Sequence, residues 1–304
     1  MTGLLGIENL TREEIQAILD RARDFQPREP RPRKLDLLRG RMVVNLFFEA
    51  STRTRTSFEI AAKRLGADTI SITAQASSVS KGESLVDTLN TLAAMRPDAI
   101  IMRHAASGAP HFLQRHLETP IINAGDGTHE HPTQALLDAR TILDRGKPLE
   151  GIRVAIIGDI AHSRVARSNV YLLSKFGAQI VLCGPASLLP VELTQIAPGV
   201  LLTTDMREAI GNADVIMMLR VQLERQHEAA FPASEYFGFY GLRLEHLELA
   251  KSNVIVMHPG PINRGREISS EVADSQRSVI LNQVENGIAV RMAVLERVLG
   301  DVRN

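Results

Sequence analysis

Short apolar runs alternate with amphipathic stretches along most of the chain, and this alternation predicts its secondary structure. Thr11 and Glu14 have capping-box spacing, and apolar positions at helical spacing follow them. Strands are then expected at 42–46, 69–72, 99–102, 120–123, 154–157, 180–182, 215–219 and 254–257. The apolar positions of 279–284 and 290–298 predict C-terminal helices. Strands that alternate with helices are typical of a doubly wound α/β fold with parallel sheets.

The pattern also predicts how the chain divides. A length of 304 residues favours about two domains. The alternation of strands and helices restarts near Gly146-Lys147-Pro148, where glycine and proline interrupt it. The expected fold class is therefore α/β, with two doubly wound parallel-sheet domains joined by helices.

Hydroxyl and guanidinium side chains gather where the first strand passes into a helix. They belong to Ser51, Thr52, Arg53, Thr54 and Arg55. Backbone N–H groups at a helix start lack partners and carry the positive end of the helix dipole. Cations are unfavourable there unless an anion lies among them, so the cluster indicates a phosphate site. A well-capped, solvated helix start is the alternative interpretation.

Three further arginines occupy positions suited to binding anions. Arg103 and Arg220 each follow an apolar strand, and strand ends of an open parallel sheet face the ligand. Arg164 falls in the first turn of a helix expected to begin near Ser163, where an anion would again be needed. A surface ion pair is the alternative for Arg103. The loop at Gly158 lacks the second glycine of a dinucleotide-binding motif, which argues against that cofactor.

A histidine pair precedes another predicted helix. Pro132 suits the first helical position, so His131 lies just before that helix. His129 and His131 could be metal ligands, but no third ligand is expected nearby. Hydrogen bonding to a substrate is the favoured interpretation, and we predict neither a metal nor a cofactor.

Composition narrows the classes of partner and compartment. Lys plus Arg and Asp plus Glu both number 35, which gives no support to binding of nucleic acid or a membrane surface through overall charge. The single cysteine, Cys183, excludes an internal disulfide framework. There is no leader-like N-terminus, and no apolar run approaches the roughly 18 residues of a membrane span. A cytoplasmic location is expected.

Two motifs point to a known family. Ser51-Thr52-Arg53-Thr54-Arg55 resembles the carbamoyl-phosphate signature of the aspartate and ornithine carbamoyltransferases, and His131-Pro132-Thr133-Gln134 matches a second family motif. The resemblance implies that Ser51, Thr52, Arg53 and Thr54 hold the phosphate. It implies that Thr54, Arg103 and His131 stabilise charge on the carbamoyl oxygen, while Gln134 orients the carbamoyl nitrogen. The implied catalytic residues are thus Arg53, Thr54, Arg103 and His131.

Other segments resemble the branch of the family that uses L-aspartate. Arg164 matches the arginine for the α-carboxylate, and Arg220-Val221-Gln222 resembles the motif for the side-chain carboxylate. Lys81, Pro259 and Gly260 complete the implied aspartate site, and Pro259 is a candidate cis proline. The family often has threonine where Val165 stands and leucine where Gly260 stands. Ornithine enzymes have a cysteine within the segment that here reads His258-Pro259-Gly260-Pro261, which disfavours ornithine.

The resemblance also implies an assembly. Ser77 and Lys81 match positions that reach into the active site of a neighbouring subunit, which implies a homotrimer with shared sites. Residues 1–133 with a C-terminal helix 286–304 would bind carbamoyl phosphate, residues 134–285 would bind aspartate, and the active site would lie in the cleft between them. Regulatory chains or a dihydroorotase are the further partners that the family allows. A catalytically silent, family-like binding subunit is an alternative, but it predicts a broken site residue, and only the mild departure at Val165 is found.

Overall fold

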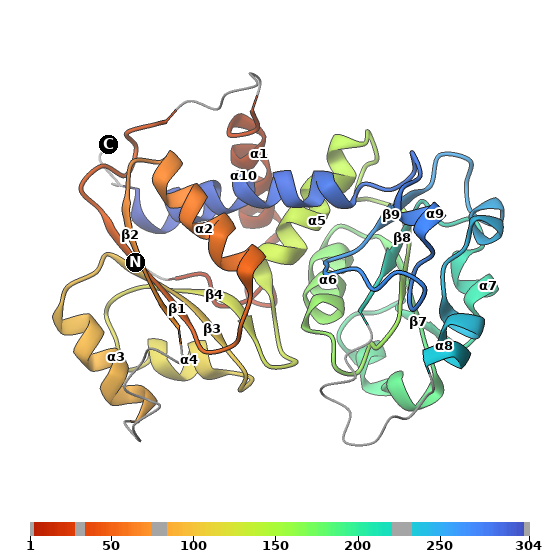
Figure 1. The fold of residues 1–304 in the computed structure, drawn as a ribbon, viewed down its shortest axis with the longest axis horizontal. Coiled ribbons are helices and arrows are strands. Elements are labelled where there is room, and N and C mark those ends of the chain that lie inside the picture. The colour runs from red at the N-terminus through yellow and green to blue at the C-terminus, as the bar shows by residue number, and fades with distance from the viewer. Residues whose placement is uncertain (1–2, 28–33, 74–83, 221–232, 301–304) are drawn as a thin grey trace. The chain divides into compact units, whose positions relative to one another are not determined.

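The computed structural model describes residues 3–27, 34–73, 84–220 and 233–300, which form two compact units (Figure 1). Unit 1 comprises residues 1–137 and 286–304, and unit 2 comprises residues 138–285. The division falls inside two helices, α5 (Pro132–Asp144) and α10 (Ile280–Leu299). Each unit has its own parallel sheet, which confirms the predicted fold class of two doubly wound domains.

The sheet of unit 1 has the strand order β2-β1-β3-β4. Its strands are β1 (Met42–Phe47), β2 (Asp68–Thr73), β3 (Ala99–His104) and β4 (Ile121–Asp126). All neighbouring pairs are parallel. The chain first winds from β1 to β2 and then returns to the other side of β1 to form β3. The direction of winding therefore reverses between β1 and β3.

Helices join these strands, and most begin where the sequence indicated. They are α1 (Arg12–Asp24), α2 (Thr52–Arg64), α3 (Leu85–Ala94), α4 (Ala109–Gln114), and the parts of α5 and α10 in unit 1. In α1, Thr11 and Glu14 make both bonds of the predicted capping box. Arg21 of α1 binds Glu296 of α10 at 2.6 Å, so the last helix is fastened to the first.

The C-terminal helices predicted from two apolar runs are one continuous helix, α10. Gly287 lies between the two runs, and glycine weakens helices. A Cβ at this position would lie 2.6 Å from the guanidinium of Arg291 and 3.3 Å from the side chain of Leu137 in α5. Glycine here permits close packing of α10 on α5, and the helix continues through it.

The sheet of unit 2 has the order β7-β6-β5-β8-β9, again with parallel pairs throughout. Its strands are β5 (Arg153–Ile157), β6 (Gln179–Cys183), β7 (Leu201–Thr203), β8 (Val215–Met218) and β9 (Ile255–Met257). Its longer helices are α6 (Arg164–Lys175), α7 (Met206–Ile210) and α8 (Ala233–Tyr240), and α9 spans Ser270–Ala273. The direction of winding reverses between β5 and β8.

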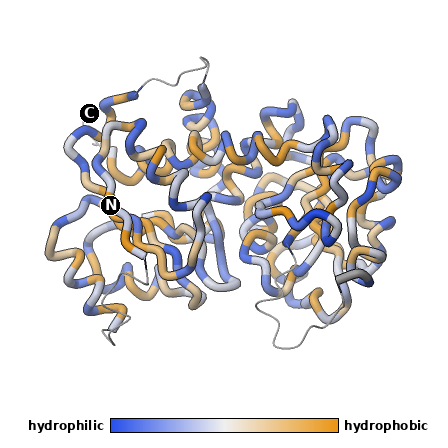
Figure 2. Tube along the Cα trace, viewed as in Figure 1, coloured by the Kyte–Doolittle hydropathy of each residue, from blue (hydrophilic) through white to orange (hydrophobic). Residues whose placement is uncertain are grey.

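The apolar runs of the sequence become the sheet interiors of both units (Figure 2). In unit 2, for example, Ala155, Val181 and Ile216 of three adjacent strands pack in one core cluster. In unit 1, Val44, Leu46 and Ile100 do the same. None of the helices in the described part of the chain is long and apolar enough to cross a membrane.

Candidate functional site

The start of α2 has the features of an anion site. Ser51 is the N-cap, and its hydroxyl accepts a hydrogen bond from the backbone N–H of Thr54 at 3.4 Å. Arg53 lies exposed in the first turn, which contains no acidic side chain. The remaining N–H groups and the helix dipole therefore favour a negative ligand at this position. Ser51, Thr52, Arg53 and Thr54 thus lie together as the sequence predicted.

Arg103 lies beside this helix start because of the sheet register. It is the last but one residue of β3 and pairs with Phe47 of β1, and its carbonyl accepts the N–H of Phe48 at 2.9 Å. Its buried guanidinium donates to Glu49 Oε1 at 2.7 Å and to the carbonyl of Ala124 at 3.3 Å. The ion pair with Glu49 fixes the direction of the guanidinium. The local sequence pattern did not indicate this partner, although Glu49 lies only two residues before Ser51.

Arg103 and the start of α2 both lie where the strand order of unit 1 reverses. In open α/β sheets, ligands bind outside the carboxyl ends of the strands at such a reversal. β1 leads into Ser51 and β3 ends near Arg103, and these are the two strands on either side of the reversal. Arg103 is ion-paired, as the alternative interpretation held, but its side chain is only 10% exposed and that of Glu49 is 25% exposed, so the pair is largely buried.

A tight turn positions His131 after the fourth strand. Asp126, the last residue of β4, accepts four hydrogen bonds, from the side chains of Asn123 and His129 and from the N–H groups of Gly108 and Glu130. Its own N–H donates to the carbonyl of Glu130 at 3.1 Å. His131 and Gln134 are both buried, and α5 begins at Pro132 as predicted.

The charge of Asp126 is maintained despite burial. Burial raises the pKa of this carboxyl, but the hydrogen bonds from His129, Asn123 and Gly108 lower it more, and the net pKa lies below its ordinary value of 3.8. The carboxylate is therefore ionised at neutral pH and acts as the acceptor at the centre of the turn. The role of Asp126 was not predicted from the sequence, although an Asp-Gly pair is a turn signal.

In unit 2, two arginines follow the strands on either side of the reversal. Arg164 is the first residue of α6 and is buried, and its N-cap Ser163 accepts the N–H of Ala166 at 3.1 Å. Arg220 follows β8 and is partly exposed. The two strand ends approach closely because Gly158 has no side chain: a Cβ there would lie 2.8 Å from that of Leu219. Both arginines thus occupy the position where such sheets bind ligands.

The loop after β9 is shaped by a buried histidine. His258 Nδ1 accepts the N–H of Gly260 at 2.8 Å, and Nε2 lies 3.1 Å from Glu267 Oε1. Both side chains are fully buried. The cis peptide bond in this segment joins Gly260 and Pro261, so the prediction of a cis Pro259 is wrong. The segment offers two X-Pro bonds, and the sequence pattern gave no means of choosing between them.

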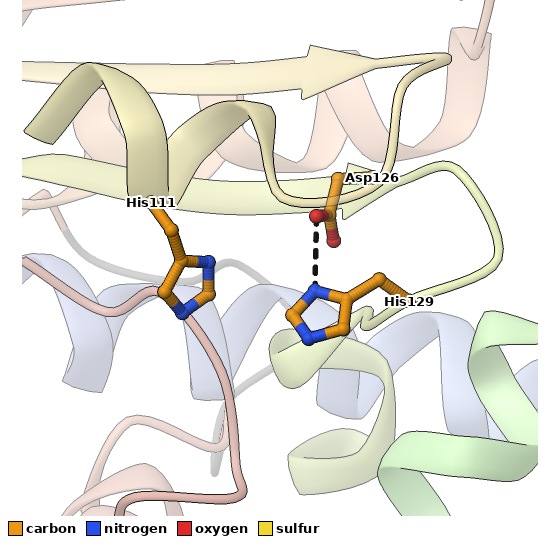
Figure 3. Close-up of side chains that lie close together, drawn as sticks. All are labelled: His111, Asp126 and His129. Atoms are coloured by element: carbon orange, nitrogen blue, oxygen red, sulfur yellow. Dashed lines mark hydrogen bonds and ion pairs between the residues drawn. The ribbon is translucent and has the colours of Figure 1, made fainter.

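The histidines near β4 have more partners than the sequence indicated. His111 of α4, Asp126 and His129 lie together, with ligand atoms within 4.8 Å of one another (Figure 3). The expectation that no third potential metal ligand lies near His129 is therefore wrong. The second group of this kind in the described residues comprises Glu8, His129 and Glu130. His131 belongs to neither group.

Three predicted site residues, Ser77, Lys81 and Gln222, lie outside the described residues. The others fall into two sets, one in each unit. Unit 1 holds the helix start at Ser51 to Thr54 together with Arg103, His131 and Gln134. Unit 2 holds Arg164, Arg220, Pro259 and Gly260.

Two family models match most of the chain. One, described as the carbamoyl-P binding domain of aspartate/ornithine carbamoyltransferase, matches residues 3–144. The other, described as the Asp/Orn binding domain of the same family, matches residues 150–298. The chain belongs to the aspartate/ornithine carbamoyltransferase family. The resemblance inferred from the motifs is thereby confirmed.

Members of this family are similar to the chain over nearly its full length. A protein of Solibacter usitatus described as an aspartate carbamoyltransferase catalytic subunit is 83% identical over 299 residues, covering 98% of this chain and 99% of the relative. A protein of Geobacter sulfurreducens with the same description is 56% identical, covering 98% and 96%. The family is thus shown by sequence over both units.

Solved structures of the family show the same two-domain fold. The ornithine carbamoyltransferase of Pyrococcus furiosus has a TM-score of 0.89 at 30% identity, covering 99% of this chain and 98% of its own. The aspartate transcarbamoylase of Trypanosoma cruzi in complex with N-(phosphonacetyl)-L-aspartic acid has a TM-score of 0.88 at 34% identity, covering 97% and 94%. Because both branches of the family match closely, the fold alone does not select the second substrate.

The central role of Asp126 in its turn leads to a stability prediction. In Asp126→Asn an amide NH₂ group replaces a carboxylate oxygen and cannot accept hydrogen bonds from the N–H donors that face it. The free energy of unfolding of unit 1 should therefore fall by about 1–3 kcal/mol at neutral pH. The carboxylate has a depressed pKa in the folded state, so its stabilisation is full above pH 3.8 and is lost as the pH falls through the folded pKa. The difference between parent and variant should therefore shrink in acid.

Denaturant unfolding followed by hydrogen exchange in β3 and β4 measures this difference. Asp20→Asn is the matched control, because Asp20 is exposed in α1 and its carboxylate accepts a hydrogen bond from the exposed side chain of Gln16. The control should change stability by less than about 0.5 kcal/mol. Equal stability of Asp126→Asn and parent at neutral pH would contradict the assignment.

Proposed function

We propose that this chain is an aspartate carbamoyltransferase, which transfers the carbamoyl group of carbamoyl phosphate to L-aspartate. The products are N-carbamoyl-L-aspartate and phosphate, and the reaction is the committed step of pyrimidine biosynthesis. The observation that carries the proposal is the placement of arginines at the strand reversal of each sheet, Arg103 in unit 1 and Arg164 with Arg220 in unit 2. Substrates with one phosphate and two carboxylates match these cations. The names of the relatives in Solibacter and Geobacter agree with this choice.

In this proposal, the start of α2 binds the phosphate. Ser51, Thr52, Arg53 and Thr54 contribute backbone N–H groups, hydroxyls and a guanidinium. Charge-assisted bonds of this kind are about twice as strong as neutral ones. The absence of an acid in the first turn of α2 supports the assignment, because a carboxylate there would compete with the phosphate.

Three donors stabilise the charge that develops on the carbamoyl oxygen. They are Thr54, Arg103 and His131. Donors already aimed at developing charge lower a barrier by about 3–4 kcal/mol each in acyl transfer. The pairing of Arg103 with Glu49 supports this role, because a guanidinium held in one direction loses little entropy when the charge forms. Gln134 and the backbone near Pro259 and Gly260 orient the carbamoyl nitrogen and the attacking amine.

Arg164 binds the α-carboxylate of aspartate, and Arg220 with Gln222 binds the side-chain carboxylate. A planar guanidinium can grip a carboxylate with two parallel hydrogen bonds. Burial of Arg164 at a helix N-terminus supports this role, since a cation there is stabilised by an anionic ligand. Val165 offers no hydroxyl, so any contact from this position comes from the backbone.

The chemistry needs no protein nucleophile. The amine nitrogen of aspartate attacks the carbamoyl carbon, and the bond from that carbon to the phosphate oxygen breaks. The amine then loses a proton, and the departing phosphate is basic enough near neutral pH to accept it. Positioning of the two substrates and electrostatic stabilisation are the contributions of the protein.

The assembly and compartment follow from the same proposal. Residues 1–133 with 286–304 bind carbamoyl phosphate, residues 134–285 bind aspartate, and the reaction brings both substrates together. Ser77 and Lys81 enter the active site of a neighbouring subunit in a cytoplasmic homotrimer. Mass in solution tests the trimer, and it also reports whether regulatory chains or a dihydroorotase join it.

The first test of the phosphate site is Arg53→Ala. Loss of this guanidinium should lower kcat/KM for carbamoyl phosphate by about two to three orders of magnitude, because phosphate charge in the transition state is left without its cation. Lys63→Ala, an exposed change in the last turn of the same helix, is the control and should keep near-normal activity. Near-normal turnover in a folded Arg53→Ala protein would contradict the phosphate assignment.

The second test concerns the choice of aspartate over ornithine. The purified chain should form carbamoylaspartate rather than citrulline. Arg220→Gln should raise the aspartate requirement by about a hundredfold or more, since two charge-assisted bonds are lost. Carbamoyl phosphate binding by this variant should hardly change. Arg207→Gln, an exposed change in α7, is the control, and its aspartate requirement and its carbamoyl phosphate binding should both stay near normal.

Two outcomes would overturn the aspartate assignment. One is faster carbamoylation of ornithine than of aspartate by the parent chain. The other is an unchanged aspartate dependence in Arg220→Gln. Absence of any carbamoyl transfer would instead favour the silent binding subunit, and titration with the substrates would show whether binding persists.

A further inference from the structure

We propose that His111, Asp126 and His129 form a binding site for a divalent transition-metal ion in unit 1, separate from the residues assigned to the substrates. The three side chains come from different segments: α4, the end of β4, and the turn between β4 and α5. One ligand atom from each lies within 4.8 Å of the others. The fold thus brings together two imidazoles and a carboxylate that the sequence separates by up to 18 positions.

The orientation of the side chains supports a shared ligand. His129 Nδ1 lies 3.0 Å from Asp126 Oδ2, and the ring of His111 stands edge-on to that of His129 with 5.3 Å between centroids. Figure 3 shows the rings of His111 and His129 and the carboxylate of Asp126 directed toward a common region. A structural hydrogen bond explains the pair of Asp126 and His129. It does not explain why His111 joins them.

His111 provides the observation that distinguishes a metal site from a simple hydrogen-bonded pair. Its Nδ1 atom is buried and has no hydrogen-bond partner among the described residues. A buried polar atom without a partner destabilises the folded state. A metal ion bound to this nitrogen, to Asp126 and to His129 would supply the missing partner.

The donor set indicates the class of ion. Imidazole nitrogens favour Zn²⁺, Ni²⁺, Co²⁺ and Cu²⁺, whereas Mg²⁺ and Ca²⁺ prefer oxygen ligands. Zn–N and Zn–O bonds of about 2.0–2.2 Å require ligand atoms roughly 3.3–3.6 Å apart in a tetrahedron. Asp126 Oδ2 and His129 Nδ1 already lie 3.0 Å apart, and side-chain rotations that bring His111 closer from its spacing of at most 4.8 Å achieve this. When the ion binds Nδ1 of His129, the neutral ring carries its single proton on Nε2, and bonds to the ion replace the hydrogen bond between His129 and Asp126.

A fourth ligand is near at hand. Glu8 forms, with His129 and Glu130, a second group in the described part of the chain whose ligand atoms lie within 4.8 Å of one another. Glu8 is exposed, so its carboxylate or a water can complete the tetrahedron. Glu130 is held by the N–H groups of Ile7 and Glu8, which links the N-terminal segment to the same turn.

The site would act on structure and not on the chemistry of carbamoyl transfer. Its ligands surround the turn that leads into His131, two residues after His129. An ion that binds the folded turn and not the unfolded chain stabilises unit 1 by mass action. Metal occupancy would therefore set the rigidity of the segment that carries His131.

The test uses the full chain without a polyhistidine tag, stripped of metal with a chelator and titrated with ZnCl₂ in the absence of substrates. We expect one Zn²⁺ per chain after dialysis and a rise in the unfolding temperature of the parent. His111→Gln should weaken Zn²⁺ binding by about tenfold or more. His116→Ala, which removes an exposed histidine two residues after α4, is the matched control and should bind as the parent does.

A second measurement keeps the test decisive if His111→Gln folds poorly. Zn²⁺ titration of the parent, followed by NMR of the histidine ring protons, should shift the signals of His111 and His129 and leave that of His116 unchanged. Absence of Zn²⁺ binding at micromolar concentration would overturn the proposal. Equal binding by a folded His111→Gln variant, or shifts confined to other histidines, would overturn it as well.

Discussion

The reversal of strand order in each sheet is the constraint on which the rest of the structure depends. Parallel strands all end at the same edge, and a reversal separates the two connections that leave the strands beside it. In unit 1 the reversal places the start of α2 beside the end of β3, and in unit 2 it places the start of α6 beside the end of β8. Helix dipoles and strand-end arginines are thereby concentrated at one position in each unit. Binding of two anionic substrates is the simplest function that uses both positions.

Buried polar contacts hold the side chains proposed for the site at the strand ends. Arg103 is fixed by Glu49, the turn before His131 is fixed by Asp126, and the loop at Gly260 is fixed by His258. A buried charge without a partner destabilises a protein by several kcal/mol, so each of these groups depends on its neighbour. Buried polar groups are also paired between helices, where Asp138 of α5 accepts hydrogen bonds from Asn169 of α6 and Gln283 of α10. Rigidity at the site therefore comes from paired buried polar groups as much as from apolar packing.

The sequence predicted the elements that its local pattern could specify. Long apolar strands such as β1 and β5, the capped starts of α1, α2 and α6, and the start of α5 at Pro132 all follow from signals within a few residues. The short edge strand β7 was missed because three partly exposed residues give no periodic signal. Glu49, Asp126 and His111 were missed for another reason: their roles arise from contacts such as that with Arg103, 54 positions from Glu49, which local patterns do not encode. The two apolar runs at the C-terminus form one helix, α10, because close packing on α5 outweighs the weak helix propensity of Gly287.

The central claim is that the residues at the carboxyl ends of the strands beside each reversal bind one pair of substrates. A crystal structure of the chain with N-(phosphonacetyl)-L-aspartic acid tests this most directly, because that compound carries both anionic parts in one molecule. The account predicts the phosphonate at the N-terminus of α2, near Arg53, and the two carboxylates at Arg164 and Arg220. A complex in which the compound contacts only one unit, or in which its carboxylates lie away from Arg164 and Arg220, would contradict the account.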